Sequence, residues 1–302
     1  MDGRISNLRQ VASLRRYEMK EGREKGLEII DCDNGKLRFL LNVSKGLDIM
    51  QLYHEGQNVS FLSKNAFTAR EIPFLNRFEG GMLYTCGLDN AGGREGYTQH
   101  GTYHETTAEI ICARCDENGI YVEAEIRASA LFGKNLLLRR KIWSAIGEET
   151  LHLEDTLTNE AFVDDEYVLL YHVNVGYPML DEGAKIELDP LSVQAVTPYA
   201  EQTMASRYEM SAPKPAEEEV CYYHTLKTPR VAFINEKIGK KFTLGYSGDT
   251  LPVFLEWKSM ASGDYAVGLE PCTSKIGDST VMQPLKAGAS VKFSLDLSVN
   301  KL

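Results

Sequence analysis

The sequence predicts an all-β protein, built as one large antiparallel β-sandwich domain over residues 1–302. Three observations support this: apolar and polar residues alternate in many segments, helical periodicity is scarce, and turn residues such as the Asp-Glu-Asn-Gly at 116–119 separate the segments. Alternation with a period of two places one face of a strand on a core and the other in water. Many such strands joined by turns are typical of stacked antiparallel sheets, not of alternating βα units.

The clearest strand is Tyr121–Arg127, in which Val122, Ala124 and Ile126 alternate with charged residues. Leu151–Thr158 and Lys292–Val299 follow the same pattern. A run of proline and charge predicts an exposed loop at Ser211–Glu219. Further strands are expected at Arg38–Val43, Asn135–Ile146, Tyr167–Gly176, Lys185–Leu188, Val231–Asn235, Phe242–Tyr246, Val253–Met260 and Tyr265–Glu270.

Composition excludes several classes of protein. The 302 residues, 43% hydrophobic and 25% charged, suffice to bury a large core. The net charge of −10 would repel a phosphate backbone, so we expect no nucleic-acid partner. No window reaches the ~18 consecutive apolar residues of a membrane helix, so we expect no membrane association. The N-terminus lacks the apolar stretch of a secretory signal, and the six cysteines are mostly scattered, which favours a cytoplasmic protein.

The segment Tyr167–Gly176 is apolar on both faces and predicts a buried central strand. His172 and Asn174 share one face of it. Unpaired buried polar groups cost roughly 1–3 kcal/mol, so these two side chains need partners. Either they belong to a hydrogen-bonded core network or they point into a cleft.

A second candidate is Glu270, which shares its strand face with Ala266 and Gly268. Such small neighbours leave room above the carboxylate for a ligand, and desolvation would raise its pKa toward that of a general base. The alternative is a solvent-exposed glutamate on an edge strand, with Gly268 marking a bulge.

No metal or cofactor site is predicted. His100 and His104 are four residues apart, a spacing that suits a metal only on a helix, and their segment is loop-like. Cys112 and Cys115 lack a second pair, and Gly92-Gly93 lacks the residues of a phosphate-binding loop.

Four motifs occur in an order that resembles the galactose mutarotase (aldose 1-epimerase) superfamily. They are Asn76-Arg77, His100-Gly101, Tyr171-His172-Val173-Asn174 and Gly268-Leu269-Glu270-Pro271. More narrowly, GGMLYTCGLDNAG, LFGKNLLLRRKI, YHVNVGYP and EWKSMASGDYAVGLEP resemble a bacterial branch of aldose 1-epimerase-like proteins.

The resemblance implies a giant β-sandwich that holds a sugar in a cleft and interconverts its anomers by acid–base ring opening, without a cofactor. By the same resemblance Glu270 is the base, His172 the acid and His100 a second histidine at the ring oxygen. Arg77, next to Asn76 at the binding site, would donate to sugar hydroxyls.

The chain departs from the true mutarotases at several positions. Tyr171 stands where they usually have an asparagine, and Asn174 is a candidate to replace that amide. No residue matches their substrate-binding aspartate. Trp257 and Lys258 are candidates to line the cleft, Trp257 as a stacking platform. Trp257 shares its strand face with Val253 and Leu255, so a place in the core is equally compatible with the sequence. With Arg77 and Lys258 in the cleft, we expect the sugar to carry an acidic or otherwise polar substituent.

Two other functions remain open from the sequence. One is a sugar-binding protein that has lost turnover. The other is an isomerase or epimerase of a keto or acidic sugar, with a metal held by histidines and Glu270. A homodimer is compatible with the sequence.

Overall fold

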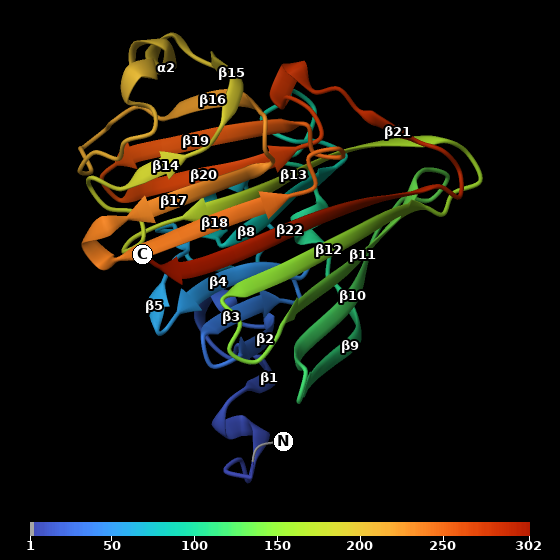
Figure 1. Ribbon diagram of the computed structural model, residues 1–302. Helices are drawn as coiled ribbons and strands as arrows, with labels where there is room; N and C mark the ends of the chain where they lie inside the picture. Colours follow the sequence, from blue (N-terminus) through green and yellow to red (C-terminus); the bar gives the residue numbers. More distant parts are fainter. Residues whose placement is uncertain (1–2) are drawn as a thin grey trace.

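The computed structural model describes residues 3–302, which form mostly β-strands, and every pair of neighbouring strands within its sheets is antiparallel (Figure 1). The all-β prediction is therefore confirmed. Residues 1 and 2 of the expected 1–302 domain lie outside the described residues.

The largest sheet has eight strands and crosses the front of the view in Figure 1. Its strands alternate between buried and partly exposed residues, as in β12, because one face packs on the core and the other faces water. In spatial order the strands are β14 (Lys185–Glu187), β17 (Arg230–Asn235), β18 (Lys240–Tyr246), β22 (Ser290–Lys301), β12 (Thr150–Asn159), β11 (Asn135–Ser144), β10 (Gly119–Ser129) and β9 (Glu109–Asp116).

A seven-stranded sheet carries the candidate site residues. Its order is β15 (Pro190–Ala195), β16 (Val220–Leu226), β19 (Val253–Ala261), β20 (Asp264–Cys272), β13 (Asp165–Val175) and β21 (Gln283–Leu285), and β8 (Leu83–Leu88) also pairs with β13. Strand β13 is buried continuously from Tyr167 to Val175, because other parts of the chain cover both of its faces.

The N-terminal part forms two smaller sheets and also supplies a short helix. One sheet contains β1 (Ser13–Glu18), β2 (Glu28–Asp33), β3 (Leu37–Asn42), β4 (Asp48–His54) and β5 (Gln57–Asn58), and the other pairs β6 (Phe61–Leu62) with β7 (Gly80–Gly81). The α-helices are α1 (Phe74–Arg77) and α2 (Pro198–Gln202). Short 3₁₀ turns lie at Leu8–Gln10, Gly22–Glu24, Tyr103–Glu105, Met204–Ser206, Glu236–Ile238 and Gly277–Ser279.

The main hydrophobic core lies between the sheets and takes buried residues from the eight-stranded, the seven-stranded and the five-stranded sheet. From β13 it takes Leu169, Tyr171 and Val173, whereas Val168 and Leu170 pack in a separate cluster on the opposite face. The two faces predicted for this strand are therefore correct, and His172 lies on the face directed away from the main core.

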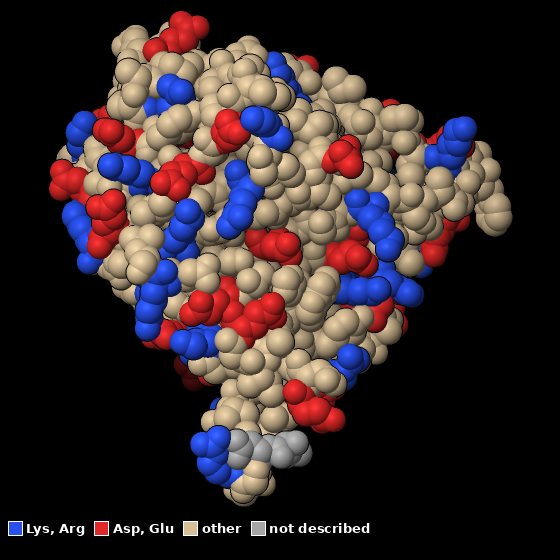
Figure 2. All heavy atoms as spheres, in the orientation of Figure 1, with Lys and Arg blue, Asp and Glu red and all other residues tan. Residues whose placement is uncertain are grey.

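The solvent face of the eight-stranded sheet mixes charges of both signs, as Figure 2 shows. Ion pairs such as Lys141 with Glu154 on neighbouring strands account for part of this mixture. Most of the 211–219 segment is exposed, as predicted. Within residues 3–302 no helix is long and apolar enough to cross a membrane.

Candidate active site

Strand pairing brings His172 and Glu270 together. The register that pairs Leu170 with Cys272 and Val173 with Leu269 places His172 opposite Glu270 on the outer face of the sheet. Nε2 of His172 lies 3.3 Å from Oε1 of Glu270. Glu270 is 1% exposed and His172 is 5% exposed. A titratable pair within proton-transfer reach is thus held between two adjacent strands.

Gly268 creates the space for this pair. A Cβ atom at position 268 would overlap Oε1 of Glu270 and would lie 3.2 Å from Cε1 of His172. The backbone of Gly268 has no positive φ, so its conformation does not require glycine. The carboxyl group instead uses the volume that a side chain at 268 would fill.

His100 approaches the pair from the long loop after β8. Its ring centroid lies 5.7 Å from that of His172, with the rings edge-on, and 5.0 Å from the ring of Phe74. The backbone N–H of Gly92 donates to Nδ1 of His100 at 3.3 Å. In the neutral ring the proton therefore sits on Nε2, which can donate to a ligand.

The three residues line one cavity of about 790 Å³. Trp257 lies in its wall, 5.4 Å from His172 between ring centroids, so its side chain is not part of the main core. Other walls come from loops and α1, namely Ser63, Lys64, Asn65, Phe74, Phe78, Gln99, Glu217, Glu219 and Ile276. The volume is in the range of small-molecule sites.

Burial shifts the proton affinities of the three residues. It raises the pKa of Glu270 well above its usual range, and the negative charge of Glu219 adds to this effect. Burial also lowers the pKa of His172 well below its usual value, helped by His100. It lowers the pKa of His100 to about 4. Burial therefore favours the neutral forms of the carboxyl group and of both imidazoles.

Two predicted substrate contacts lie elsewhere in the structure. Arg77, at the end of α1, is 5% exposed and pairs with Glu105, and it is not among the residues that line the cavity. Lys258 follows Trp257 on β19 and so points to the opposite face, where its Nζ donates to the carbonyl oxygen of Arg207 at 2.7 Å. Both cations expected in the cleft satisfy internal partners instead.

The two asparagines differ in position. Asn76 is exposed at the cavity rim. Asn174 is fully buried, and its Nδ2 donates to the carbonyl oxygen of His172 at 2.9 Å. Asn174 therefore supports the backbone of the strand that presents His172 and does not line the cavity.

A buried ionic network lies behind the site. Arg140 is fully buried and donates from Nε and Nη2 to Asp155, and from Nη1 to Asp48 at 2.6 Å. Tyr171, on the inner face of β13, donates to Asp155 at 2.7 Å. The network was not expected, although the alternation of β11 and β12 places Arg140 and Asp155 among inward-facing residues. The parity of charged residues within these strands could have revealed it.

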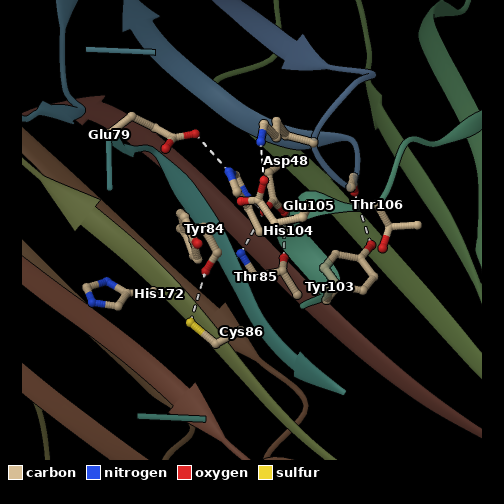
Figure 3. Close-up of polar contacts among 12 residues, drawn as sticks. Asp48, Glu79, Tyr84, Thr85, Cys86, Tyr103, His104, Glu105, Thr106 and His172 are labelled. Carbon is tan, nitrogen blue, oxygen red and sulfur yellow. Dashed lines mark hydrogen bonds and ion pairs between the residues drawn. The ribbon is translucent and has the colours of Figure 1, made fainter. Parts of the chain in front are cut away.

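His104 extends this network toward the site (Figure 3). Its Nδ1 lies 2.7 Å from Asp48 and its Nε2 lies 2.8 Å from Glu79. Ionised carboxylates only accept hydrogen bonds, so both ring nitrogens donate and His104 is an imidazolium. Burial alone would lower the pKa of His104, but Glu79 and Asp48 outweigh it and raise that pKa. Tyr84 stacks on this cation at 3.8 Å and lies between His104 and His172 in Figure 3.

Sequence reasoning also missed Glu217 and Glu219, which border the cavity from the exposed 211–219 segment. The sequence of a charged loop does not indicate that the loop faces a site, because only the tertiary fold places it beside the cavity. Within residues 3–302 no three His, Cys, Asp or Glu side chains are arranged so that they could hold a metal ion together.

A family model described as "Domain of unknown function (DUF4432)" matches residues 24–299. The chain belongs to the DUF4432 family. No curated protein matches this DUF4432 chain significantly in sequence.

The DUF4432 chain is similar in structure to proteins of the galactose mutarotase type. A Klebsiella pneumoniae protein provisionally named an aldose 1-epimerase superimposes with a TM-score of 0.87 at 21% identity, over 97% of this chain and 86% of the other. A galactose mutarotase-like protein from Clostridium acetobutylicum superimposes with a TM-score of 0.75 at 12% sequence identity, over 97% of this chain and 100% of the other. A Salmonella typhimurium protein provisionally named a mutarotase superimposes with a TM-score of 0.69 at 12% sequence identity, over 99% of this chain and 96% of the other. The expected mutarotase-like fold is therefore confirmed.

Proposed function

We propose that this DUF4432 protein interconverts the anomers of an aldose by acid–base ring opening. The observation that carries the proposal is the His172–Glu270 pair, 3.3 Å apart, in a cavity that His100 also lines. The similarity to proteins named as aldose 1-epimerases and mutarotases supports the same reaction class.

The reaction requires one proton acceptor and one proton donor on either side of the anomeric centre. Glu270 removes the proton of the anomeric hydroxyl while His172 protonates the ring oxygen, and the bond between the anomeric carbon and the ring oxygen breaks. The resulting aldehyde rotates and recloses on its other face. Reclosure returns one proton from Glu270 and one to His172, so the protein ends unchanged.

The electrostatics of the pair suit this cycle. The pair needs one proton between its two members. When this proton is on His172, the imidazolium is the acid and the carboxylate of Glu270 is the base. Burial raises the pKa of Glu270, which makes its carboxylate a stronger base, and lowers that of His172, which makes its imidazolium a stronger acid. His100 contributes its Nε2–H as a hydrogen-bond donor, since its Nδ1 accepts from Gly92. Trp257 offers an aromatic wall against which a sugar ring can pack.

The test is anomer exchange measured by nuclear magnetic resonance across a panel of neutral, amino and acidic aldoses. We expect the protein to accelerate exchange of at least one of them above the spontaneous rate. Saturable binding without any acceleration would instead favour a sugar-binding protein that has lost turnover. No binding and no acceleration for the whole panel would overturn the proposal.

A further inference from the structure

The charges around the cavity are mostly neutralised by one another. Lys64 pairs with Asp264, with its Nζ 2.8 Å from the carboxylate. Glu217 accepts a hydrogen bond from the hydroxyl of Tyr199 at 2.7 Å and lies 3.9 Å from Nζ of Lys214. These groups therefore leave little net charge for a ligand.

Glu219 is different. Its Oε2 accepts a hydrogen bond from Nε1 of Trp257 at 2.8 Å, and this donor is neutral. No ion pair to Glu219 is present among residues 3–302, although its side chain borders the cavity. Its negative charge also reaches Glu270, where it raises the pKa of the carboxyl group. Glu219 thus presents a carboxylate without a cationic partner to the space above the reacting pair.

A second observation points to a ligand in the same place. Oε1 of Glu270, on a residue that is 1% exposed, lies 3.3 Å from Nε2 of His172 but accepts no hydrogen bond in the described part of the chain. A buried, unsatisfied carboxyl oxygen facing a cavity calls for a donor from outside the protein. Glu270 thus supplies an acceptor for a ligand's hydrogen-bond donor, and Glu219 supplies the unpaired negative charge that favours a cationic group.

The cavity also lacks the groups that an anion would need. Arg77 and Lys258, the two cations expected there from the sequence, pair with Glu105 and with the carbonyl oxygen of Arg207. A carboxylate, phosphate or sulfonate on the sugar would meet the charge of Glu219, and the one cation among the lining residues within 3–302, Lys64, is already paired with Asp264. The expectation of an acidic substituent therefore loses its structural basis.

We propose that the cavity prefers aminosugars, with Glu219 as the carboxylate that pairs with their ammonium group, over neutral sugars and over uronic acids. This inference rests on the proposed function, which makes the ligand an aldose, and it adds the chemical class of that aldose. Trp257 fixes the position of the carboxylate through its Nε1–H, so the ammonium group would meet an acceptor that is already oriented.

The expected preference is moderate because Glu219 is partly in water. Partly exposed ion pairs change affinity by about twofold to tenfold, and salt weakens them. We expect glucosamine to bind more tightly than glucose by a factor in this range, and glucuronate to bind more weakly than glucose. The galacto series should show the same order.

The experiment measures dissociation constants by calorimetry for both sugar series with the wild-type protein and with Glu219→Gln. The amide keeps an oxygen that accepts from Trp257 but removes the charge, so it separates the electrostatic role from the anchoring role. In this variant, the affinity for glucosamine should fall to that for glucose, glucuronate should bind better, and glucose should change less than about twofold. Added salt should weaken binding of the aminosugar to wild type only.

Three results would overturn the inference. Tightest binding of a uronate would show that an anion site exists. An equal loss of glucose and glucosamine in Glu219→Gln would reduce Glu219 to an anchor for Trp257. Equal affinities of the wild-type protein for the amino and neutral sugars would show that Glu219 does not pair with an ammonium group. In each of these three cases, anomer exchange would still test the proposed function independently. If none of these sugars binds and none shows accelerated anomer exchange, the proposed function fails together with the inference.

Discussion

Gly268 lies beside the carboxyl group of Glu270, in the one position where the absence of a side chain gives Oε1 its space. Both residues are on β20, two positions apart, so their side-chain directions coincide. The glycine is therefore part of the geometry that sets the distance between Glu270 and His172.

We predict that Gly268→Ala displaces the Glu270 carboxyl group and slows anomer exchange by at least about tenfold, since misplaced reacting groups cost rate steeply. Gly245→Ala is the matched control, because a Cβ there would meet only Asp296, at 3.8 Å, and Gly245 also lies within a strand. Exchange rates and thermal unfolding of both variants provide the measurement. Equal activity of the two variants would mean that the position of Glu270 does not matter.

Glu270→Gln should reduce anomer exchange by roughly 10²–10⁴-fold, the usual loss of a positioned base, while sugar affinity changes little. The amide keeps the shape of the side chain but cannot take the hydroxyl proton near neutral pH. Unfolding curves check that the fold is kept. A variant with full turnover would assign Glu270 a purely structural role.

Replacing His104 should destabilise the protein strongly. His104→Leu leaves Asp48 and Glu79 without their shared cation, and breaking a buried ionic contact in this way costs about 3–5 kcal/mol. His152→Leu, which removes a more exposed ion pair, should cost less than about 1 kcal/mol. Chemical denaturation of the two variants gives the comparison.

The pH dependence of this loss has a defined sign. The pKa of His104 is raised above 6.5 in the folded protein, so its contribution is complete below pH 6.5 and declines as pH rises through the folded value. The pKa of Asp48 is held below 3.8, so its contribution is lost only as pH falls below that value. The difference in unfolding free energy between wild type and His104→Leu should therefore be largest between about pH 4 and 6.5. A difference that grows above pH 7 would contradict an imidazolium at this position.

Lys258→Met should leave anomer exchange and sugar affinity unchanged and lower the unfolding free energy by about 1–2 kcal/mol. The ammonium group donates to backbone carbonyl oxygens of the 206–209 segment, which would lose these bonds. Exchange assays and denaturation provide the two readouts. A selective loss of binding to an acidic sugar in this variant would return Lys258 to the cavity.

The sequence predicts the strands best where one face meets water. In β10, β12 and β22 the alternation is regular, so their positions and faces follow directly. Strands β2, β4 and β8 were not predicted, since β2 and β4 are largely buried and β8 wholly so, and buried strands alternate less clearly. Strands β1, β9, β15 and β16 were not predicted either, although each of them is at least partly exposed.

Parity on a strand also explains which site residues could be placed. His172 and Glu270 sit on strands whose faces the sequence defines, and the structure brings both to one cavity. Lys258 was assigned to the same cavity as Trp257, but adjacent residues in a strand point to opposite faces, so only one of the two could lie there. Arg77 sits on a four-residue helix, where no periodicity indicates which partner it meets.

The cavity takes the His172–Glu270 pair from the sheet and part of its wall from the 63–65 and 217–219 segments. Strand β13 holds His172 on one face while Tyr171 on the other bonds to the buried network, which leaves that strand little freedom to vary. The side chains at 64, 65 and 217–219 are instead at least partly exposed. Libraries restricted to these exposed positions should therefore change which ligands the cavity accepts with little change in thermal stability.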